Sequence, residues 1–384
     1  MRLYKGFLSI LLLFLFSIPL GMNAVIVNKK TSIIENSMED FPVPESILES
    51  TKTKLQASLD KFRYNGTVLI SYKNRVIFEE ARGYANFKTK APITLESQFQ
   101  LASASKPFTA LSIMILKERN LLEYDDKVKK YIPNFPYPEI SIRNLLNHTA
   151  GLQNYMYLVD NYWAADKTIS NQNMLNLLID HKLPLNNPPG SRFEYSNTGY
   201  AVLALVVEQI TNQYFGDFLQ IEIFDKIGMT NSFVYNRRIL EQNPNQVIGY
   251  VPTRRGYRPY EHEPNNDILG DKSVYSTVFD LYRFEKALNN YELVKEETLR
   301  EAYTKAILLN NRSVNYGFGW RMIDEEDRSY IFHNGLWHGF TSTITREPKE
   351  DISVIMLNNT HASINTIKHE LLDILHTQFA SCQK

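Results

Sequence analysis

The chain has 384 residues, in which 42 lysines and arginines balance 42 aspartates and glutamates. A net charge of zero gives no reason to expect nucleic acid or an anionic membrane surface as a general partner. The 23 tyrosines and 21 phenylalanines exclude a disordered chain, because so many large aromatic side chains are typical of a folded core.

The first 24 residues have the layout of a secretory signal peptide. Arg2 and Lys5 precede an apolar run over residues 7–20, and the small residue Ala24 stands where cleavage would occur. We therefore expect an exported protein, periplasmic or extracellular, without a stable membrane span after cleavage. The alternative is an uncleaved anchor at the N-terminus.

One folded domain is expected over residues 46–384. It follows a polar segment over residues 25–45, which contains two prolines and which we interpret as a linker. Cys382 is the only cysteine, so no internal disulfide can form and the fold must depend on packing alone.

The first part of this domain combines a helix, a hairpin and a second, apolar helix. Apolar residues at helical spacing predict a helix over residues 51–62. Two β-rich runs follow, over residues 67–72 and 75–85, and the short polar stretch between them predicts a hairpin. A nearly apolar stretch then predicts a buried helix that begins near Ser103, with Pro107 in its first turn, where a missing N–H is best tolerated.

The two ends of the domain are predicted to share one sheet. Helical patterns broken by turn clusters such as VPTRRGYRP fill the middle of the chain, and strand patterns return only near its end, before a last amphipathic helix. We therefore predict an α+β fold with one antiparallel β-sheet flanked by helices. Both chain ends, about residues 46–100 and 265–384, would build it, with an all-helical region inserted at about residues 101–264.

The stretch LASASKPFTA places a serine and a lysine at a spacing that suits nucleophilic catalysis. Ser103 and Lys106 are three residues apart on one helix face, so hydroxyl and amine can meet. A lysine can take the serine proton only if burial or a neighbouring cation lowers its pKa. The SxxK pattern alone is weak evidence, because Ser58 and Lys61 repeat it on what we expect to be a solvated helix face.

A tyrosine–serine–asparagine segment supplies a second proton-handling group. Tyr195 and Asn197 follow a proline-rich loop and precede an apolar helix, so a short active-site loop could hold them near the serine. The looser pattern Tyr-x-Asn also begins at Tyr72 and at Tyr84, within the predicted hairpin, where we interpret it as structural. This pattern alone is therefore weaker evidence than SxxK.

A histidine–asparagine–glycine segment lies at the end of a β-rich run. Gly335 would let a substrate lie close along the strand edge, and the N–H of Leu336 could then join the N–H of Ser103 in an oxyanion hole. The alternative is an ordinary hairpin whose turn follows Gly335, with His333 as a hydrogen-bonded surface residue. On this segment alone we favour the hairpin.

In this order, SxxK, YSN and HxG resemble the serine β-lactamase and penicillin-binding DD-peptidase superfamily, in its class C β-lactamase-like branch. The stretches LLNHTAGL, PPG, GDKSVYSTVFDL, YGFGW and WHGF are similar to that branch too, so the resemblance runs from about residue 55 to the C-terminus. It implies a catalytic domain in which Ser103 is the acylated nucleophile, Lys106 its general base and Tyr195 the second proton relay.

The resemblance also implies which residues bind the substrate. Asn197 would bond the substrate amide and Lys106, while His333, Asn334 and Gly335 would form the substrate-binding strand and Leu336 would complete the oxyanion hole. No metal or other cofactor is implied. The class C branch typically carries Lys-Thr-Gly at the third element, whereas a histidine of ordinary pKa is mostly neutral at about pH 7.4. Weaker carboxylate binding favours a peptidase or esterase over an efficient β-lactamase.

We therefore expect a serine hydrolase that acts on an amide or ester, such as a D-amino-acid peptide, a small ester or a β-lactam, through an acyl-serine. The alternative is a penicillin- or peptide-binding or sensing protein that acylates without hydrolysis.

Three further features are interpreted as structural or left open. Glu285 fits the ExxLN pattern of class A enzymes, but no Ser-Asp-Asn accompanies it, so we assign Glu285 to a helix surface. His148 is expected to order a turn rather than to react. Aromatic residues between Asn154 and Asn187 could line the pocket or serve as plain packing.

Overall fold

The computed structural model describes residues 43–164, 167–260, 264–325 and 328–380. The predicted signal peptide, and the predicted linker as far as residue 42, lie outside these residues. The described helices include none that is both long enough and apolar enough to cross a membrane.

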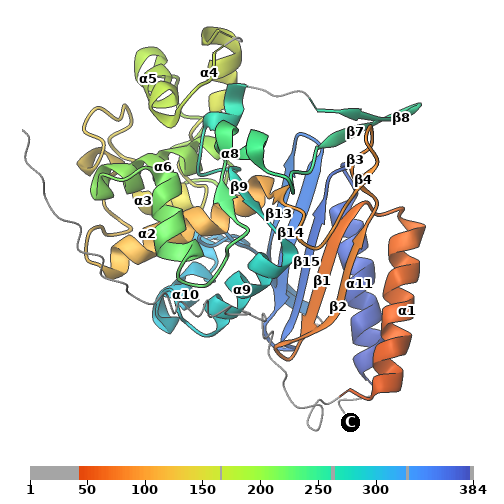
Figure 1. The fold of residues 1–384 in the computed structure, drawn as a ribbon. Helices are drawn as coiled ribbons and strands as arrows, with labels where there is room; N and C mark the ends of the chain where they lie inside the picture. Colours follow the sequence, from red (N-terminus) through yellow and green to blue (C-terminus); the bar gives the residue numbers. More distant parts are fainter. Residues whose placement is uncertain (1–42, 165–166, 261–263, 326–327, 381–384) are drawn as a thin grey trace, which may run out of the picture. The chain divides into compact units, whose positions relative to one another are not determined.

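A six-stranded antiparallel sheet is built from both parts of the chain that the sequence pattern assigned to it (Figure 1). Its strand order is β12-β13-β14-β15-β1-β2, and the register of β1 with β15 places Ile70 opposite Val354. This sheet and its flanking helices confirm the predicted α+β fold. The strands are β1 (Gly66–Tyr72), β2 (Arg75–Arg82), β12 (Arg321–Glu325), β13 (Arg328–Trp337), β14 (Phe340–Glu347) and β15 (Ile352–Asn358).

Helices cover both faces of this sheet. On one face α1 (Glu45–Lys61) and α11 (Ile364–Phe379) lie side by side, and on the other α9 (Val278–Asn289) packs against β1 and β15 (Figure 1). Every residue of β1 and of β15 is therefore buried. The nearly continuous apolar sequences of these two strands fit this position, since a strand covered on both faces has no solvated side.

The helical region surrounds two helices that are apolar on all sides. The first, α2 (Lys106–Glu118), is buried from its first residue to Leu116, and the second, α6 (Asn197–Thr211), is buried from Thr198 to Val207. Helices of this kind belong in the interior. The remaining helices are α3 (Ile142–Leu146), α4 (Tyr155–Tyr162), α5 (Asn171–His181), α7 (Phe215–Leu219), α8 (Arg237–Gln242) and α10 (Glu296–Ala302).

Short strands in the middle of the chain correct the prediction that strands return only near its end. A hairpin forms within the stretch VPTRRGYRP, which we interpreted as a turn cluster. Only its two arginines, at residues 254 and 255, lie in the turn, and the residues on either side pair as antiparallel strands. These and other short strands are β3 (Tyr84–Asn86), β4 (Ala91–Pro92), β5 (Phe99–Gln100), β6 (Phe233–Val234), β7 (Tyr250–Thr253), β8 (Gly256–Pro259), β9 (Val274–Ser276), β10 (Ala306–Ile307) and β11 (Ser313–Val314).

The serine of the SxxK pattern at residues 58–61 is packed rather than solvated, contrary to the prediction. Ser58 is 4% exposed, and its hydroxyl donates to the carboxylate of Glu370 at 2.9 Å. Lys61 pairs with the same carboxylate from the rim at 2.6 Å. The face of α1 that carries Ser58 is the face that packs against α11, so its hydroxyl is a structural contact.

Glu285 is also buried, which makes its assignment to a helix surface wrong. Only 2% of this residue is exposed, because α9 turns this face towards the sheet. Burial raises the pKa of the Glu285 carboxyl to about 7, although the nearby Arg346 cation partly opposes the rise. Among the described residues, one carboxyl oxygen of Glu285 has no hydrogen-bond partner.

Glu285→Gln should stabilise the protein above neutral pH. The unfolded chain releases this proton near the ordinary value of 4.5, whereas the folded protein retains it to about pH 7. The stability that the protonated carboxyl preserves is therefore lost as the pH rises from about 4.5 to about 7, and the loss amounts to about 3 kcal/mol at pH 8. Thermal melts at pH 5 and pH 8 measure this. The variant should melt higher than the wild type at pH 8 and much like it at pH 5, and an equal difference at both values would contradict the burial argument.

Candidate active site

The predicted nucleophile lies on a single 3₁₀ turn, η2 (Ala102–Ser105), that rests on β13. Ala102 has a φ of 51°, in the left-handed region that a residue with a Cβ rarely adopts. Such local strain persists only where the surroundings impose it, and it places Ser103 at a sharp entry to α2. The buried helix that the sequence placed near Ser103 is therefore an α-helix only from Lys106 onward.

Gly335 is needed for this packing. A Cβ at that position would lie 1.9 Å from the carbonyl oxygen of Leu101 and 3.0 Å from the Cβ of Ala102. From the neighbouring strand, the hydroxyl of Ser342 donates to the same carbonyl at 2.6 Å. We expected this glycine to make room for a substrate, and the structure shows that it also makes room for the backbone of the nucleophile's turn.

The amine of Lys106 contacts three oxygen atoms. Its Nζ lies 3.2 Å from Ser103 Oγ, 2.9 Å from Asn197 Oδ1 and 2.9 Å from the carbonyl oxygen of Asp271. The amide and peptide oxygens can only accept, so they take two N–H groups. In a neutral amine the lone pair is then left to face the serine hydroxyl, which is the arrangement that a general base requires.

Burial lowers the pKa of the Lys106 amine, so the neutral form that can accept a proton is populated near pH 7. Lys106 has no exposed surface, and its desolvation lowers the pKa of the amine to about 7. The Asp271 carboxylate opposes this shift and the Arg321 cation adds to it. A substantial part of the protein thus holds a neutral Lys106 at pH 7, so no external activator is needed.

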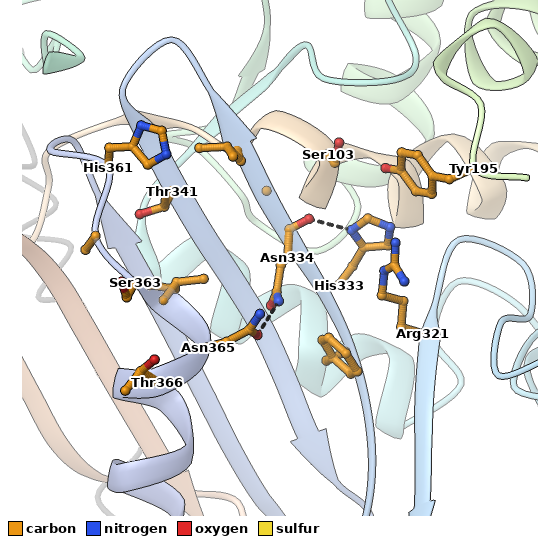
Figure 2. Close-up of a pocket in the computed structure, with 15 residues that line it drawn as sticks. Ser103, Tyr195, Arg321, His333, Asn334, Thr341, His361, Ser363, Asn365 and Thr366 are labelled. Atoms are coloured by element: carbon orange, nitrogen blue, oxygen red, sulfur yellow. Dashed lines mark hydrogen bonds between the residues drawn. The ribbon is translucent and has the colours of Figure 1, made fainter. Parts of the chain in front are cut away.

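Tyr195 contacts the nucleophile from the other side. Its phenol oxygen and the Ser103 hydroxyl face each other at the cavity wall (Figure 2). Desolvation raises the pKa of the Tyr195 phenol, so it retains its proton at neutral pH. The Lys106 Nζ lies 4.8 Å from the centre of the same ring. The resting site therefore pairs a proton acceptor, Lys106, with a proton donor, Tyr195.

A directed chain of hydrogen bonds holds the Tyr195 loop. The N–H of Ser196 donates to His148 Nδ1 at 3.1 Å, so Nε2 of this ring carries the proton and donates to the Tyr316 hydroxyl at 3.0 Å. The rings of His148 and Tyr195 have centres 4.3 Å apart. His148 thus supports the proton relay without contacting Ser103 in any recorded bond, and Tyr316 is a member that sequence reasoning missed.

This chain of hydrogen bonds ends at His333, on the predicted substrate-binding strand, and gives His333 a structural role. Nδ1 of His333 can only donate to the carbonyl of Asn334, at 2.8 Å, so Nε2 accepts from Tyr316 at 3.1 Å. His333 is 1% exposed, and burial and the nearby cations lower its pKa well below the ordinary value. His333 is therefore not the surface residue of the alternative interpretation. The ring is neutral, has both nitrogens occupied and stabilises the strand that it was expected to equip for binding.

A cavity of about 620 Å³ opens over these groups (Figure 2). Ser103 and Tyr195 lie at one side of it, while Lys106 and Asn197 stand behind the serine and do not line it. The lining also includes Arg321, residues 332–336, Thr341 and residues 361–366, which lead into the first turn of α11. Of the predicted site residues, the structure thus brings all eight to this cavity or directly behind it.

Individual lining residues differ in how far they match their predicted roles. Asn334 donates to Asn365 Oδ1 at 2.6 Å, and its own Oδ1 has no partner among the described residues. Leu336 is 53% exposed at the cavity wall, and the role of its N–H in an oxyanion hole stays a prediction. Within the described ranges, no group of three or more histidine, cysteine or acidic residues could hold a metal ion.

The aromatic residues between Asn154 and Asn187 do not line the cavity. Tyr155 is fully buried elsewhere, while Tyr157 and Tyr162 are exposed at the surface. Trp163 donates its indole N–H to the carbonyl of Lys167 at 2.9 Å. Plain packing and surface positions therefore account for this segment.

Comparison with known proteins agrees with this geometry. A family model described as Beta-lactamase matches residues 53–375. Penicillin-binding protein 4* of Bacillus subtilis (strain 168) is 35% identical over 311 residues, which cover 78% of this chain and 69% of that protein. The chain belongs to the beta-lactamase family.

Solved structures show how widely this beta-lactamase-family fold is used. EstCE1, a hydrolase with promiscuous acyltransferase activity, superposes with a TM-score of 0.73 at 23% identity, covering 86% of this chain and 99% of its own. D-amino acid amidase from Ochrobactrum anthropi SV3 superposes with a TM-score of 0.71 at 20% identity, covering 86% of this chain and 99% of its own. At these identities the likeness shows the shared fold.

The rate of Ser103 acylation should rise about tenfold between pH 6 and pH 8. With the pKa of Lys106 near 7, the fraction of neutral amine rises by about this factor over that interval. Initial rates of p-nitrophenyl ester cleavage, corrected at each pH with Ser103→Ala, measure the profile. Lys106→Met should abolish the pH-dependent limb. A rate that is flat between these two values would show that Lys106 is not the base.

Proposed function

We propose that this protein is an exported serine hydrolase that cleaves an amide or ester through an acyl-serine, as a peptidase or esterase rather than an efficient β-lactamase. The observation that supports this proposal is the contact of one hydroxyl, that of Ser103, with a buried amine and a protonated phenol at the wall of a cavity. Export rests on the signal-like first 24 residues, and a mature protein that begins near Val25 would support it.

The proposed reaction moves protons between Ser103, Lys106 and Tyr195 in two half-reactions, acylation and deacylation. Lys106 takes the hydroxyl proton as Ser103 Oγ attacks the carbonyl carbon, and Tyr195 gives its proton to the leaving nitrogen or oxygen as that bond breaks. The Lys106 ammonium then returns a proton to the Tyr195 phenolate, which completes acylation. In deacylation Lys106 takes a proton from the attacking water, and Tyr195 gives its proton to Ser103 Oγ as the acyl bond breaks. The Lys106 ammonium then gives a proton to the Tyr195 phenolate through the regenerated serine hydroxyl, which restores the resting state.

Arg321 supports a substrate that carries a free carboxylate. Its guanidinium lines the cavity beside Ser103 and Tyr195, and its recorded contacts are with the rings of Tyr195 and Tyr316, at 5.3 and 5.7 Å. No acidic side chain of the described residues is recorded as its partner. An unpaired guanidinium in a polar cavity is suited to bind a carboxylate through two parallel hydrogen bonds. It could supply the cation that His333, as a neutral ring, cannot.

These features favour a peptide that ends in a free carboxylate close to the scissile amide. The D-amino acid amidase and the promiscuous hydrolase among the structural neighbours support amide and ester chemistry on this fold. The relative named as a penicillin-binding protein supports the alternative, in which Ser103 is acylated and not released. A fluorescent penicillin separates the two, because a persistent label means trapping and a transient one means turnover.

Ser103→Ala should abolish p-nitrophenyl ester cleavage and covalent labelling by a fluorescent penicillin, because no other hydroxyl contacts Lys106 in a recorded bond. The matched control is Ser58→Ala, which removes the serine of the SxxK pattern at residues 58–61, at the contact between α1 and α11. The control should retain both activities. Activity that survives in Ser103→Ala, or that is lost equally in both variants, would refute the assignment.

Arg321→Met should lower kcat/KM about 10- to 100-fold for a D-Ala-D-Ala peptide with a free carboxylate, the range expected for loss of a charged hydrogen-bonded pair. Cleavage of the same peptide with an amidated C-terminus should change much less. This substrate pair serves as the internal control, since damage to Tyr195 would lower both rates together. Equal losses for the two peptides would contradict carboxylate binding by Arg321.

A further inference from the structure

Behind the catalytic lysine lies a buried ion pair to which the reaction gives no direct part. Asp271 is fully buried and Lys272 is 2% exposed. The Lys272 amine lies 3.3 Å from Asp271 Oδ1 and donates to the Tyr155 hydroxyl at 2.6 Å, while that hydroxyl donates to Asp271 Oδ2 at 3.0 Å. The pair and the tyrosine thus satisfy one another, and the backbone carbonyl of Asp271 is left to accept from Lys106 at 2.9 Å.

The loop that carries this carbonyl is fastened to the helix that carries Lys106. Thr109 donates to the carbonyl of Gly270 at 2.6 Å, and the N–H of Val274 donates to Ser105 Oγ at 2.9 Å. Gly270 has a φ of 99°, and a Cβ there would lie 2.5 Å from the carbonyl oxygen of Tyr200. Position 271 is therefore held from both sides, so its carbonyl and its carboxylate have fixed places relative to Lys106.

The charges around Lys106 make Lys272 necessary for the chemistry. The other titratable groups near the amine are His148 and His333, which burial keeps neutral, the phenols Tyr155, Tyr195, Tyr200 and Tyr316, which burial keeps protonated, and the cation Arg321 at the cavity. Asp271 is thus the carboxylate that acts on Lys106. Without Lys272 the charge of this carboxylate would act on Lys106 unopposed and favour its ammonium form, which cannot accept a proton.

We propose that Tyr155, Asp271 and Lys272 form a positioning network for Lys106, in which a fixed peptide carbonyl orients the amine and Lys272 occupies the carboxylate that would otherwise keep Lys106 protonated. This inference rests on the proposed function, because it assigns the network to the base of that reaction. None of the three residues contacts Ser103 in a recorded bond, so they act through Lys106 alone.

The test compares Asp271→Asn, Lys272→Met and the double variant in the pH profile of p-nitrophenyl ester cleavage. Lys272→Met should move the acid limb up by about one pH unit, because the freed carboxylate stabilises the Lys106 ammonium. Asp271→Asn should move it down by about one unit, because the ammonium loses this attraction. The double variant removes both charges, and its limb should fall between those of the single variants.

The direction of the Asp271→Asn shift separates this network from simple structural damage. Water entering a loosened site would relieve the desolvation of Lys106 and move the limb upward in every variant, so an upward shift in Asp271→Asn overturns the proposal. If Asp271→Asn does not fold, the double variant decides, since adding the second change should reverse the upward shift of Lys272→Met. An unreversed shift overturns the proposal.

Failure of this network is distinguishable from failure of the proposed function. Wild-type activity that does not depend on Ser103 would remove the hydrolase assignment itself. Ser103-dependent activity with an acid limb that stays in place in both single variants would remove the network alone. A ¹³C NMR titration of the labelled lysine side chains, with Lys106→Met to assign the signal, gives the same shifts without turnover.

Discussion

The burial of one amine without a carboxylate in contact is the constraint on which the site depends. Lys106 opens α2 inside the protein, and its three bonded neighbours are a hydroxyl, an amide oxygen and a peptide oxygen. None of these carries a full negative charge, so nothing in contact offsets the loss of water around the ammonium. The free energy that keeps this lysine neutral must come from the packing of α2 and α6, and stability and reactivity are therefore coupled through the same two helices.

Proton positions in the surrounding network follow from two end groups, one donor and one acceptor, that can each play only one role. A peptide N–H at Ser196 and a peptide carbonyl at Asn334 stand at its two ends, so each ring nitrogen between them has a determined role. The chain connects the loop of the proton donor with the substrate strand. Protonation of His148 would break its bond from the Ser196 N–H, and protonation of His333 would break or reverse its bond from Tyr316, so the network favours the neutral form of both rings.

Several parts of the fold and site could be predicted because they depend on local spacing. The three-residue separation of Ser103 and Lys106, the period of the β-rich runs and the order of the three motifs are visible in the sequence. The two predictions that failed for polar residues, at Ser58 and Glu285, depend instead on which helix face meets another element. A serine or glutamate in a helical pattern carries no sign of a tertiary partner, and here α11 and the sheet supplied one.

Arg321 and Tyr316 were missed for a related reason. Both lie in or beside YGFGW, which was noticed only as a resemblance, and neither has a residue type that marks it as part of a serine nucleophile site. Their position follows from the pairing of β12 with β13, which places Arg321 opposite Phe332 and so next to the substrate strand. Register of this kind is set by the whole sheet, since a shift of one residue would turn every side chain of the strand to the opposite face.

The pairing of β1 with β15 has a consequence for when the protein becomes reactive. The cavity wall needs the beginning of α11, and the turn that carries Ser103 needs β13 and β14 to rest on, so the nucleophile emerges during synthesis long before its surroundings exist. In a nascent chain, Lys106 would be hydrated and cationic. The hydroxyl would then be no more reactive than that of any free serine, so the order of the elements along the chain delays reactivity until the last strands and α11 are in place.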